Sequence, residues 1–251
     1  MGRTGARSAG RIKKVRWAIA AVVAVLAVAA AVYLNTSYAA GDEAHAALTS
    51  DAAVQVTVQD DGDLVFAPAE GAANGAGLIF YPGGKVDPRA YAPLMRAAAE
   101  RGFTCVLVHF PFNLAVFDPN AASGEEEAFP QVERWYIGGH SLGGAMAAAY
   151  AADHAGDFRG LLLCGAYATK DLGASGLAVT SVYGTDDGVL NRDAYAKNRG
   201  NIPQAVEDAI EGGCHSYFGD YGLQDGDGTP TISRDEQIAR TVDDLAAMDR
   251  R

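Results

Sequence analysis

Short apolar runs alternate with longer segments of mixed polarity along most of the chain. Each run is long enough for one β-strand, and several of the segments between the runs have the pattern of a helix. The expected strands cover residues 77–81, 103–108, 134–137, 161–166, 177–183 and 205–210. Because strands that alternate with helices form parallel sheets, the pattern predicts an α/β fold with a mainly parallel, doubly wound sheet.

The two ends of this pattern differ from its middle. Residues 54–58 and 64–66 flank the turn sequence DDGD, which predicts an antiparallel hairpin that opens the fold. Residues 87–101 are expected to form one helix that a glycine ends. The last helix should begin at Ser233, because Ser233 and Glu236 have the spacing of a capping box.

The N-terminus forms a separate segment. Six Lys and Arg residues precede an uncharged run of 18 residues, 17–34. As a helix this run would be about 27 Å long, close to the thickness of the hydrocarbon core of a membrane. We therefore expect a transmembrane signal anchor, with the basic flank in the cytoplasm and the rest of the chain outside. The alternative is a secretory signal peptide that is cut near residues 37–39.

Charge follows the same division of the chain. The first 40 residues carry +6 and the remaining 211 carry −17, which together give the −11 of the whole chain. Such an acidic domain should repel nucleic acid, so no nucleic-acid partner is expected. Cys105 and Cys164 lie in apolar strand patterns and Cys214 precedes a histidine, with no CxxC pair and no His/Cys cluster. Zinc is therefore not expected, nor is a cofactor.

A calcium loop is the one metal motif to weigh. The sequence DGDG at residues 225–228 hints at calcium, and Glu236 lies at the twelfth position of such a loop. However, Pro230 occupies the place where an EF-hand needs glycine. A surface turn that leads into the last helix accounts for the same residues, so no metal is expected.

The sequence GGHSLGG at residues 138–144 contains the pattern G-x-S-x-G. An expected strand precedes it, and a helix pattern of small residues follows it. A serine between a strand and a helix lies on a tight turn that exposes its hydroxyl, and Gly139 and Gly143 leave room for the chain to reverse. This setting predicts that Ser141 is a nucleophile.

A serine hydroxyl is a weak nucleophile, so a base must take its proton and an acid must orient the base. His215 is the expected base, because it lies on a glycine-rich loop after the last expected strand. Asp186 and Asp187 both follow the strand at residues 177–183. We favour Asp187 as the acid and keep Asp186 as the alternative.

Four other histidines fit the role of the base less well. They lie near a stalk, at the end of an apolar strand, next to the serine, and at the end of a helix where a positive charge suits the helix dipole. His45 lies near the stalk and His109 ends the strand. His140 is next to the serine, and His154 ends the helix.

The oxyanion that forms at a carbonyl carbon needs N–H donors. The backbone N–H of Leu142 is the first candidate, because Leu142 follows the nucleophile. The second should come from the loop after the strand at residues 77–81, where two glycines let the backbone approach a ligand closely. Gly84 and Lys85 are the candidates for that donor, and the side chain of Lys85 is expected to be a solvated surface group.

Together these motifs resemble the α/β-hydrolase superfamily, and in particular the small, mostly bacterial α/β-hydrolase fold-5 family. The resemblance covers roughly residues 50–250 and rests on five segments in order: FYPGGKV, PFNLAV, GGHSLGG, YGTDDG and GGCH. It implies an α/β-hydrolase fold with an eight-strand type of sheet and a Ser-Asp-His hydrolase. It does not imply a substrate. The loop after the first parallel strand lacks the His-Gly pattern of many relatives, which leaves the second oxyanion donor open.

Many α/β-hydrolases insert a lid after the strand that follows the serine helix. Only about ten residues separate that strand from the acid-bearing strand here, so we expect no large lid and an open site, unless residues 110–129 fold over it. Residues 1–40 would then be the basic segment with its anchor, residues 41–52 a stalk, and residues 53–251 the α/β-hydrolase catalytic domain.

The resulting hypothesis is a membrane-anchored, extracytoplasmic serine hydrolase that resembles carboxylesterases. Its expected substrate is a small ester or thioester, and its N-terminal helix is its contact with the membrane. The alternative is a non-catalytic, surface-anchored binding protein on the same fold. The substrate, the acyl-chain preference and the oligomeric state stay open.

Overall fold

The computed structural model describes residues 4–251. The chain divides into two compact units, Met1–Ser37 and Tyr38–Arg251. The first unit contains one helix, α1 (Thr4–Asn35). In the part of the chain that the structure describes, no helix is both long and apolar enough to cross a membrane, so the expected transmembrane anchor is not supported. The expected basic flank begins at Arg3, which lies outside the described residues.

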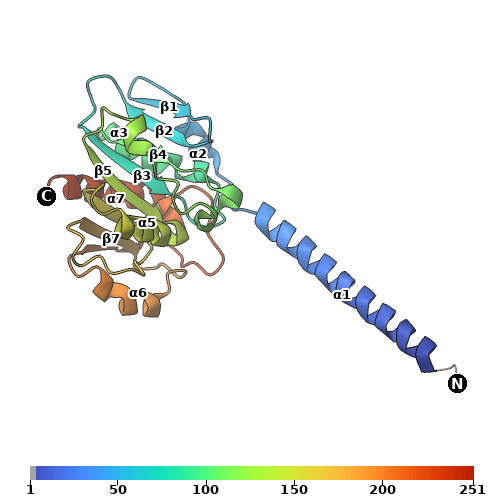
Figure 1. The fold of residues 1–251 in the computed structure, drawn as a ribbon. Coiled ribbons are helices and arrows are strands. Elements are labelled where there is room, and N and C mark those ends of the chain that lie inside the picture. The colour runs from blue at the N-terminus through green and yellow to red at the C-terminus, as the bar shows by residue number, and fades with distance from the viewer. Residues whose placement is uncertain (1–3) are drawn as a thin grey trace. The chain divides into compact units, whose positions relative to one another are not determined.

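The second unit contains an eight-stranded sheet in the order β1-β2-β4-β3-β5-β6-β7-β8 (Figure 1). The strands are β1 (Val54–Val58), β2 (Leu64–Pro68), β3 (Ala76–Tyr81), β4 (Thr104–Leu107), β5 (Arg134–His140), β6 (Gly160–Cys164), β7 (Ala178–Gly184) and β8 (Val206–Ile210). β1 and β2 form an antiparallel hairpin, and β2 pairs antiparallel with β4. All neighbours from β4 to β8 pair in parallel, which confirms the predicted mainly parallel sheet with its N-terminal hairpin.

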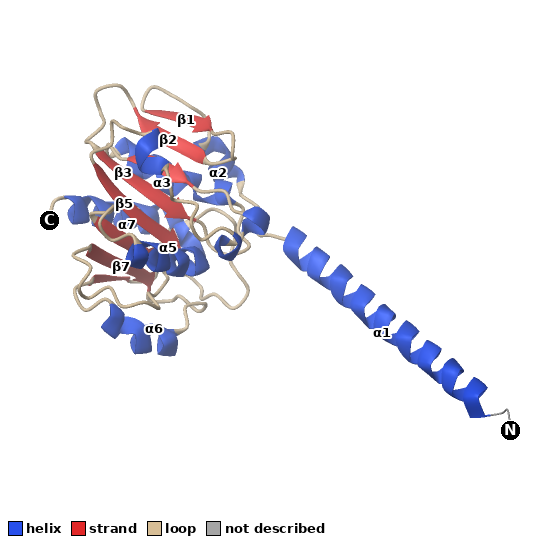
Figure 2. Cartoon of the chain, in the orientation of Figure 1, coloured by secondary structure: helices blue, strands red, loops and turns tan. Residues whose placement is uncertain are grey.

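Helices cover both faces of this sheet (Figure 2). In this unit they are α2 (Asp42–Ala47), α3 (Ala92–Glu100), α4 (Glu125–Ala128), α5 (Ser141–Asp153), α6 (Arg192–Asn198) and α7 (Arg234–Asp249). α2, α3 and α7 pack into one apolar cluster, and α5 packs into the cluster of the other face. β3 and β4 are buried at every position, which explains why they appear in the sequence as apolar runs without alternation.

Two helix predictions have different outcomes. The segment expected as one helix over residues 87–101 is a 3₁₀ turn, Pro88–Tyr91, followed by α3. The turn begins where the Asp87 side chain accepts a hydrogen bond from the N–H of Arg89. The capping box of α7 is confirmed, because the side chains of Ser233 and Glu236 each bond the other's backbone N–H.

The segment expected as a stalk, residues 41–52, packs against the domain instead. α2 buries Ala44 and Ala47, and the N–H of Ala44 donates to Oδ2 of Asp220 at 2.9 Å. Oδ1 of Asp220 accepts from Arg234 at 2.6 Å. The start of α2 is therefore fixed to the domain by a carboxylate that lies far along the chain.

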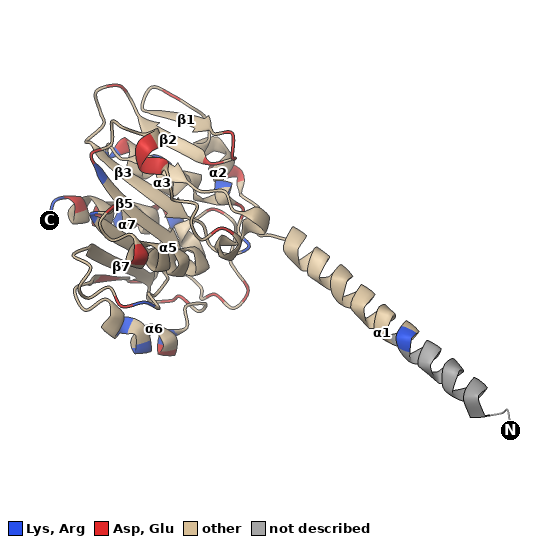
Figure 3. Ribbon diagram, viewed as in Figure 1, with Lys and Arg blue, Asp and Glu red and all other residues tan. Residues whose placement is uncertain are grey.

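Acidic residues, red in Figure 3, are spread over many loops and helices of this unit. This distribution agrees with the charge of −17 on the 211 residues after residue 40. The three cysteines are free and buried, as the apolar strand patterns around Cys105 and Cys164 predict.

Candidate active site

Ser141 is the first residue of α5 and directly follows β5, at the point where the chain turns from strand to helix. Its backbone has φ of +53°, a left-handed conformation that costs a residue with a side chain about 1–3 kcal/mol. The chain packs closely around this turn, and it can do so because residue 143 has no side chain: a Cβ on Gly143 would overlap the carbonyl oxygens of Tyr81 and Pro82. The serine is partly exposed at the carboxyl end of β5. This is the strained turn that the G-x-S-x-G pattern predicts.

His215 and Asp187 come from the loops after the last two strands and meet at the same edge of the sheet. Nδ1 of His215 lies 2.8 Å from Oδ2 of Asp187, and both side chains are fully or almost fully buried. The other oxygen of Asp187 accepts from the N–H groups of Val189 at 2.9 Å and Leu190 at 2.7 Å. Because an ionised carboxylate only accepts hydrogen bonds, Nδ1 of His215 carries the proton.

The opposite ring nitrogen of His215, Nε2, takes no part in this contact. Among the described residues, Nε2 of His215 has no hydrogen-bond partner and is buried. His215 and Ser141 both line a pocket of about 200 Å³. Leu142, Tyr167 and Leu190 contribute to its walls. The pocket therefore brings a serine hydroxyl and a free imidazole nitrogen to one place.

Gly165, at the end of β6, lies directly against the His215–Asp187 pair. Its φ is +53°, and a Cβ at this position would come within 2.9 Å of Nδ1 of His215 and 3.2 Å of Oδ2 of Asp187. No side chain fits there without moving the pair. The sequence analysis did not identify this glycine, because only the packing of β6 against the β8 loop gives it a role.

The alternative acid and three of the other histidines lie elsewhere. The backbone N–H of Asp186 donates to the carbonyl of Gly213, and its partly exposed side chain forms no ion pair or hydrogen bond among the described residues. His45 and His109 are exposed, and His154 stacks on Tyr150 at the end of α5. The structure thus joins Asp187, rather than Asp186, to His215.

His140 is fully buried beneath His215, with 4.3 Å between the two ring centroids. The hydroxyl of Tyr91 accepts from the N–H of Gly83 at 3.0 Å and lies 2.8 Å from Nδ1 of His140. The Tyr91 hydroxyl therefore links the backbone of the oxyanion loop to the ring of His140. Burial, and then the nearby His215, lowers the pKa of His140 well below its usual value, so this ring stays neutral.

The two candidates for the second oxyanion donor differ in their hydrogen bonds. The N–H of Lys85 donates to the carbonyl oxygen of Asn113 at 2.7 Å, so it is already used. A Cβ on Gly84 would come within 2.8 Å of Cδ2 of Leu142, which places the Gly84 backbone beside the residue after the serine. Among the described residues, the N–H of Gly84 donates no hydrogen bond to another group. The geometry favours Gly84 over Lys85.

Asp227 supports the loop that carries the histidine. Its carboxylate accepts from the N–H of His215 at 3.0 Å, from the N–H and hydroxyl of Ser216 at 2.8 and 2.7 Å, and from the N–H of Gly188 at 3.2 Å. The Asp227 carboxylate is therefore occupied by donors from two loops, and Glu236 caps α7. Two of the carboxylates that a calcium loop would use, Asp227 and Glu236, therefore already accept hydrogen bonds from the protein.

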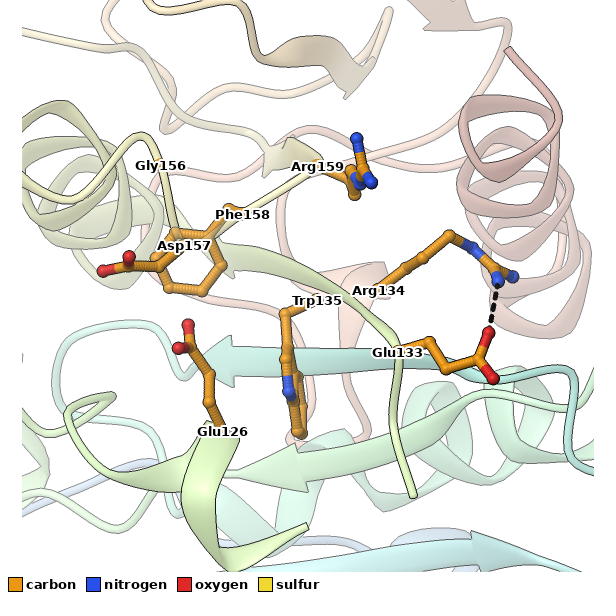
Figure 4. Close-up of a pocket in the computed structure, with 8 residues that line it drawn as sticks. All are labelled: Glu126, Glu133, Arg134, Trp135, Gly156, Asp157, Phe158 and Arg159. Carbon is orange, nitrogen blue, oxygen red and sulfur yellow. Dashed lines mark ion pairs between the residues drawn. The ribbon is translucent and has the colours of Figure 1, made fainter. Parts of the chain in front are cut away.

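A second hollow, of about 440 Å³, lies at the opposite edge of the sheet, where β5 begins (Figure 4). Glu133 and Arg134 face each other there at 3.8 Å, and the rings of Trp135 and Phe158 form part of the wall. Ligands of open α/β sheets bind at the carboxyl ends of the strands, whereas this hollow lies at the amino ends. Its lining residues also include no pair of nucleophile and base.

Comparison with known proteins agrees with this geometry. The alpha/beta hydrolase family matches residues 77–239. No curated protein matches the chain. Among solved structures, a predicted CIB-like hydrolase from Thermoplasma acidophilum is 14% identical with a TM-score of 0.54, and the match covers 78% of this chain and 99% of that one.

Two solved structures with esterase names also share the fold. Est1E from Butyrivibrio proteoclasticus is 12% identical with a TM-score of 0.56, over 79% of this chain and 100% of that one. A mutant of the esterase rPPE is 16% identical with a TM-score of 0.56, over 82% of this chain and 87% of that one. At these identities the likeness concerns the fold.

Proposed function

Because the chain belongs to the alpha/beta hydrolase family, we propose that it is a serine hydrolase, similar to carboxylesterases, that cleaves an ester or a thioester. The observation that carries this proposal is the His215–Asp187 pair. Nε2 of His215 has no hydrogen-bond partner among the described residues, and His215 lines the same pocket as Ser141. The esterase names of two proteins with the same fold favour this reaction over other hydrolytic reactions.

The first half of the reaction forms an acyl-enzyme. Oγ of Ser141 attacks the carbonyl carbon of the substrate while Nε2 of His215 takes the hydroxyl proton. The carbonyl oxygen becomes an oxyanion, which the N–H groups of Leu142 and Gly84 stabilise. The bond to the leaving alcohol or thiol then breaks, and His215 returns the proton to that group.

The second half releases the acid. A water molecule gives a proton to Nε2 of His215 and attacks the acyl carbon. The bond from this carbon to Oγ of Ser141 breaks, and Oγ regains the proton. Asp187 stays ionised throughout and keeps His215 in the correct tautomer.

A fluorophosphonate probe tests the nucleophile. The wild-type chain should be labelled on Ser141, and Ser141→Ala should abolish labelling and lower kcat by at least about a thousandfold at an unchanged Tm. A wild-type chain that is neither labelled nor active on short esters would support the alternative, a binding protein without catalytic activity.

A matched pair of variants tests the acid. Asp187→Asn should lower kcat by a factor on the order of 10⁴, because the amide favours the wrong histidine tautomer. Asp186→Asn is the control and should have little effect, since the Asp186 side chain forms no bond to His215. The reverse ranking would assign the acid to Asp186.

We also propose that the domain acts outside the cytoplasm. The support comes from the sequence: six basic residues and then an uncharged run precede a domain of charge −17. Fractionation with N-terminal sequencing tests this location. A mature chain that begins near residue 40 would indicate secretion, and an intact chain in the membrane fraction would indicate a retained attachment. An intact chain found only in the cytoplasm would overturn the proposal.

A further inference from the structure

Three carboxylates meet at the tip of the β1–β2 hairpin, away from the pocket of Ser141. Asp61 and Asp63 lie on the hairpin turn, and Glu125 is the first residue of α4. One oxygen of each residue lies within 4.8 Å of the others. Two segments that are distant in sequence therefore present like charges to each other at short range.

Two of these carboxylates are buried. Asp63 is 4% exposed and Glu125 is 7% exposed, whereas Asp61 is exposed. Oε2 of Glu125 is buried, and among the described residues it has no hydrogen-bond partner. An ionised group in this position is costly unless another group compensates for its charge.

The protein itself supplies little compensation. The N–H of His109 donates to Oδ1 of Asp63 at 2.7 Å, and the N–H of Asp63 donates to Oδ1 of Asp61 at 3.0 Å. In the described part of the chain, no Lys or Arg forms an ion pair with any of the three carboxylates. The other titratable groups that act on Asp63 are His109 and Asp118, and Asp118 adds further negative charge.

We propose that Asp61, Asp63 and Glu125 bind one calcium ion, which joins the tip of the β1–β2 hairpin to α4. The ligand set is all oxygen, which suits a hard divalent cation. Calcium–oxygen distances of about 2.3–2.6 Å allow ligand atoms up to about 5 Å apart, so oxygens that lie within 4.8 Å of one another can share one calcium ion. Because Asp61 is exposed, water can reach the ion and complete its coordination.

The proposed ion would also stabilise the segment between β4 and β5. Glu125 is the only member of the cluster on this segment, which also contains Phe112 and Phe117. Without a cation, burial and then the neighbouring Asp61 and Asp63 charges disfavour the ionised form of Glu125, with a pKa of about 7. A bound cation would offset that cost and hold α4 against the hairpin.

Calcium titration of the full chain after treatment with EDTA tests the proposal. Isothermal titration calorimetry should show one calcium per chain, and at a free concentration of about 100 times Kd the Tm should rise by roughly 5–10 °C. Glu125→Gln should remove the calcium-dependent rise without lowering the Tm of the metal-free chain, since it replaces a buried unpaired carboxylate with a neutral amide. Asp61→Asn, at an exposed position, should weaken binding by at least about tenfold.

Glu127→Gln is the matched control. Glu127 lies on α4 but is exposed and outside the cluster, so this variant should bind calcium as the wild type does. A wild-type chain without binding or a Tm shift would overturn the proposal, and so would calcium binding by Glu125→Gln equal to that of the wild type. An equal response to magnesium would overturn the assignment to calcium. None of these readouts depends on the proposed hydrolase activity.

Discussion

At the scale of single residues, Asp227 links the two loops of the proposed triad. It accepts hydrogen bonds from His215 and Ser216 on the base loop and from Gly188 on the acid loop. Burial raises the pKa of Asp227, but hydrogen bonds from Ser216 and the other donors outweigh burial and keep the pKa below its ordinary value. The carboxylate is therefore ionised at neutral pH and acts as a fixed acceptor for both loops.

Asp227→Asn should lower kcat by up to about a hundredfold with little change in KM, because one acceptor oxygen becomes an N–H₂ group that faces N–H donors. If the contact between His215 and Asp187 becomes looser, the carboxylate stabilises the protonated form of His215 less. The acid limb of the kcat/KM profile should therefore move to lower pH. Asp225→Asn, at an exposed position, is the control.

The pH profile separates positioning of His215 from a purely structural role of Asp227. If Asp227 only stabilises the fold, Asp227→Asn will lower the Tm and the amount of folded protein but leave the profile in place. That result, with kcat per folded molecule unchanged, would contradict the prediction.

At the scale of elements, the sequence predicts what local signals specify. The hairpin, the parallel strands and the start of α7 each have such a signal, and the structure agrees with them. The packing of residues 41–52 has none, because α2 is held by Asp220 and Arg234 through contacts that only the tertiary fold creates. The break of the helix at residues 87–101 could be predicted only in part. The early proline is visible in the sequence, but the sequence does not show that the first turn is a 3₁₀ turn.

Asp244 on α7 supplies a prediction at this scale. Its Oδ2 is buried without a partner among the described residues, and burial, followed by the neighbouring Asp208, raises the pKa of Asp244 to about 7. The unfolded chain releases this proton near pH 4, so the folded chain binds more protons between about pH 4 and 7 and loses stability as pH rises. Asp244→Asn should therefore raise the Tm at about pH 8 and leave it unchanged at about pH 4.

A series of thermal scans across this pH range measures the effect. Asp243→Asn is the control, since Asp243 is exposed, its surface pair with Arg101 contributes little, and among the neighbouring charges its effect on the pKa of Asp244 is the smallest. An equal Tm difference at both ends of the pH range would show that Asp244→Asn acts through packing and not through charge.

At the scale of the whole molecule, the order of the parallel strands determines which loops meet at the candidate site. Ser141, Asp187 and His215 each follow the carboxyl end of a parallel strand, so the topology brings them to one rim. That part of the candidate site could be predicted from the sequence. The contacts of Gly165 and Asp227 could not, because they depend on how neighbouring loops pack in three dimensions.

The lack of a lid over the pocket predicts which acyl chains the site accepts, and this prediction rests on the proposed function. The 13 residues between β6 and β7 contain no helix, so no lid is inserted there, as the sequence predicts. The pocket of about 200 Å³ is smaller than the typical 300–1,000 Å³ of ligand sites. Phe112 and Phe117 are 48% and 53% exposed, and they do not line the pocket.

A longer acyl chain would therefore gain little burial. Each methylene contributes about 0.8 kcal/mol only where it leaves water, so kcat/KM for p-nitrophenyl esters should level off after a few carbons. The series should run from acetate to palmitate, below the critical micelle concentration. Phe117→Ser should not change the profile if the exposed aromatic pair lies outside the acyl site. A maximum at about eight carbons or more, lost in Phe117→Ser, would show instead that Phe112 and Phe117 fold over the pocket and form the acyl wall.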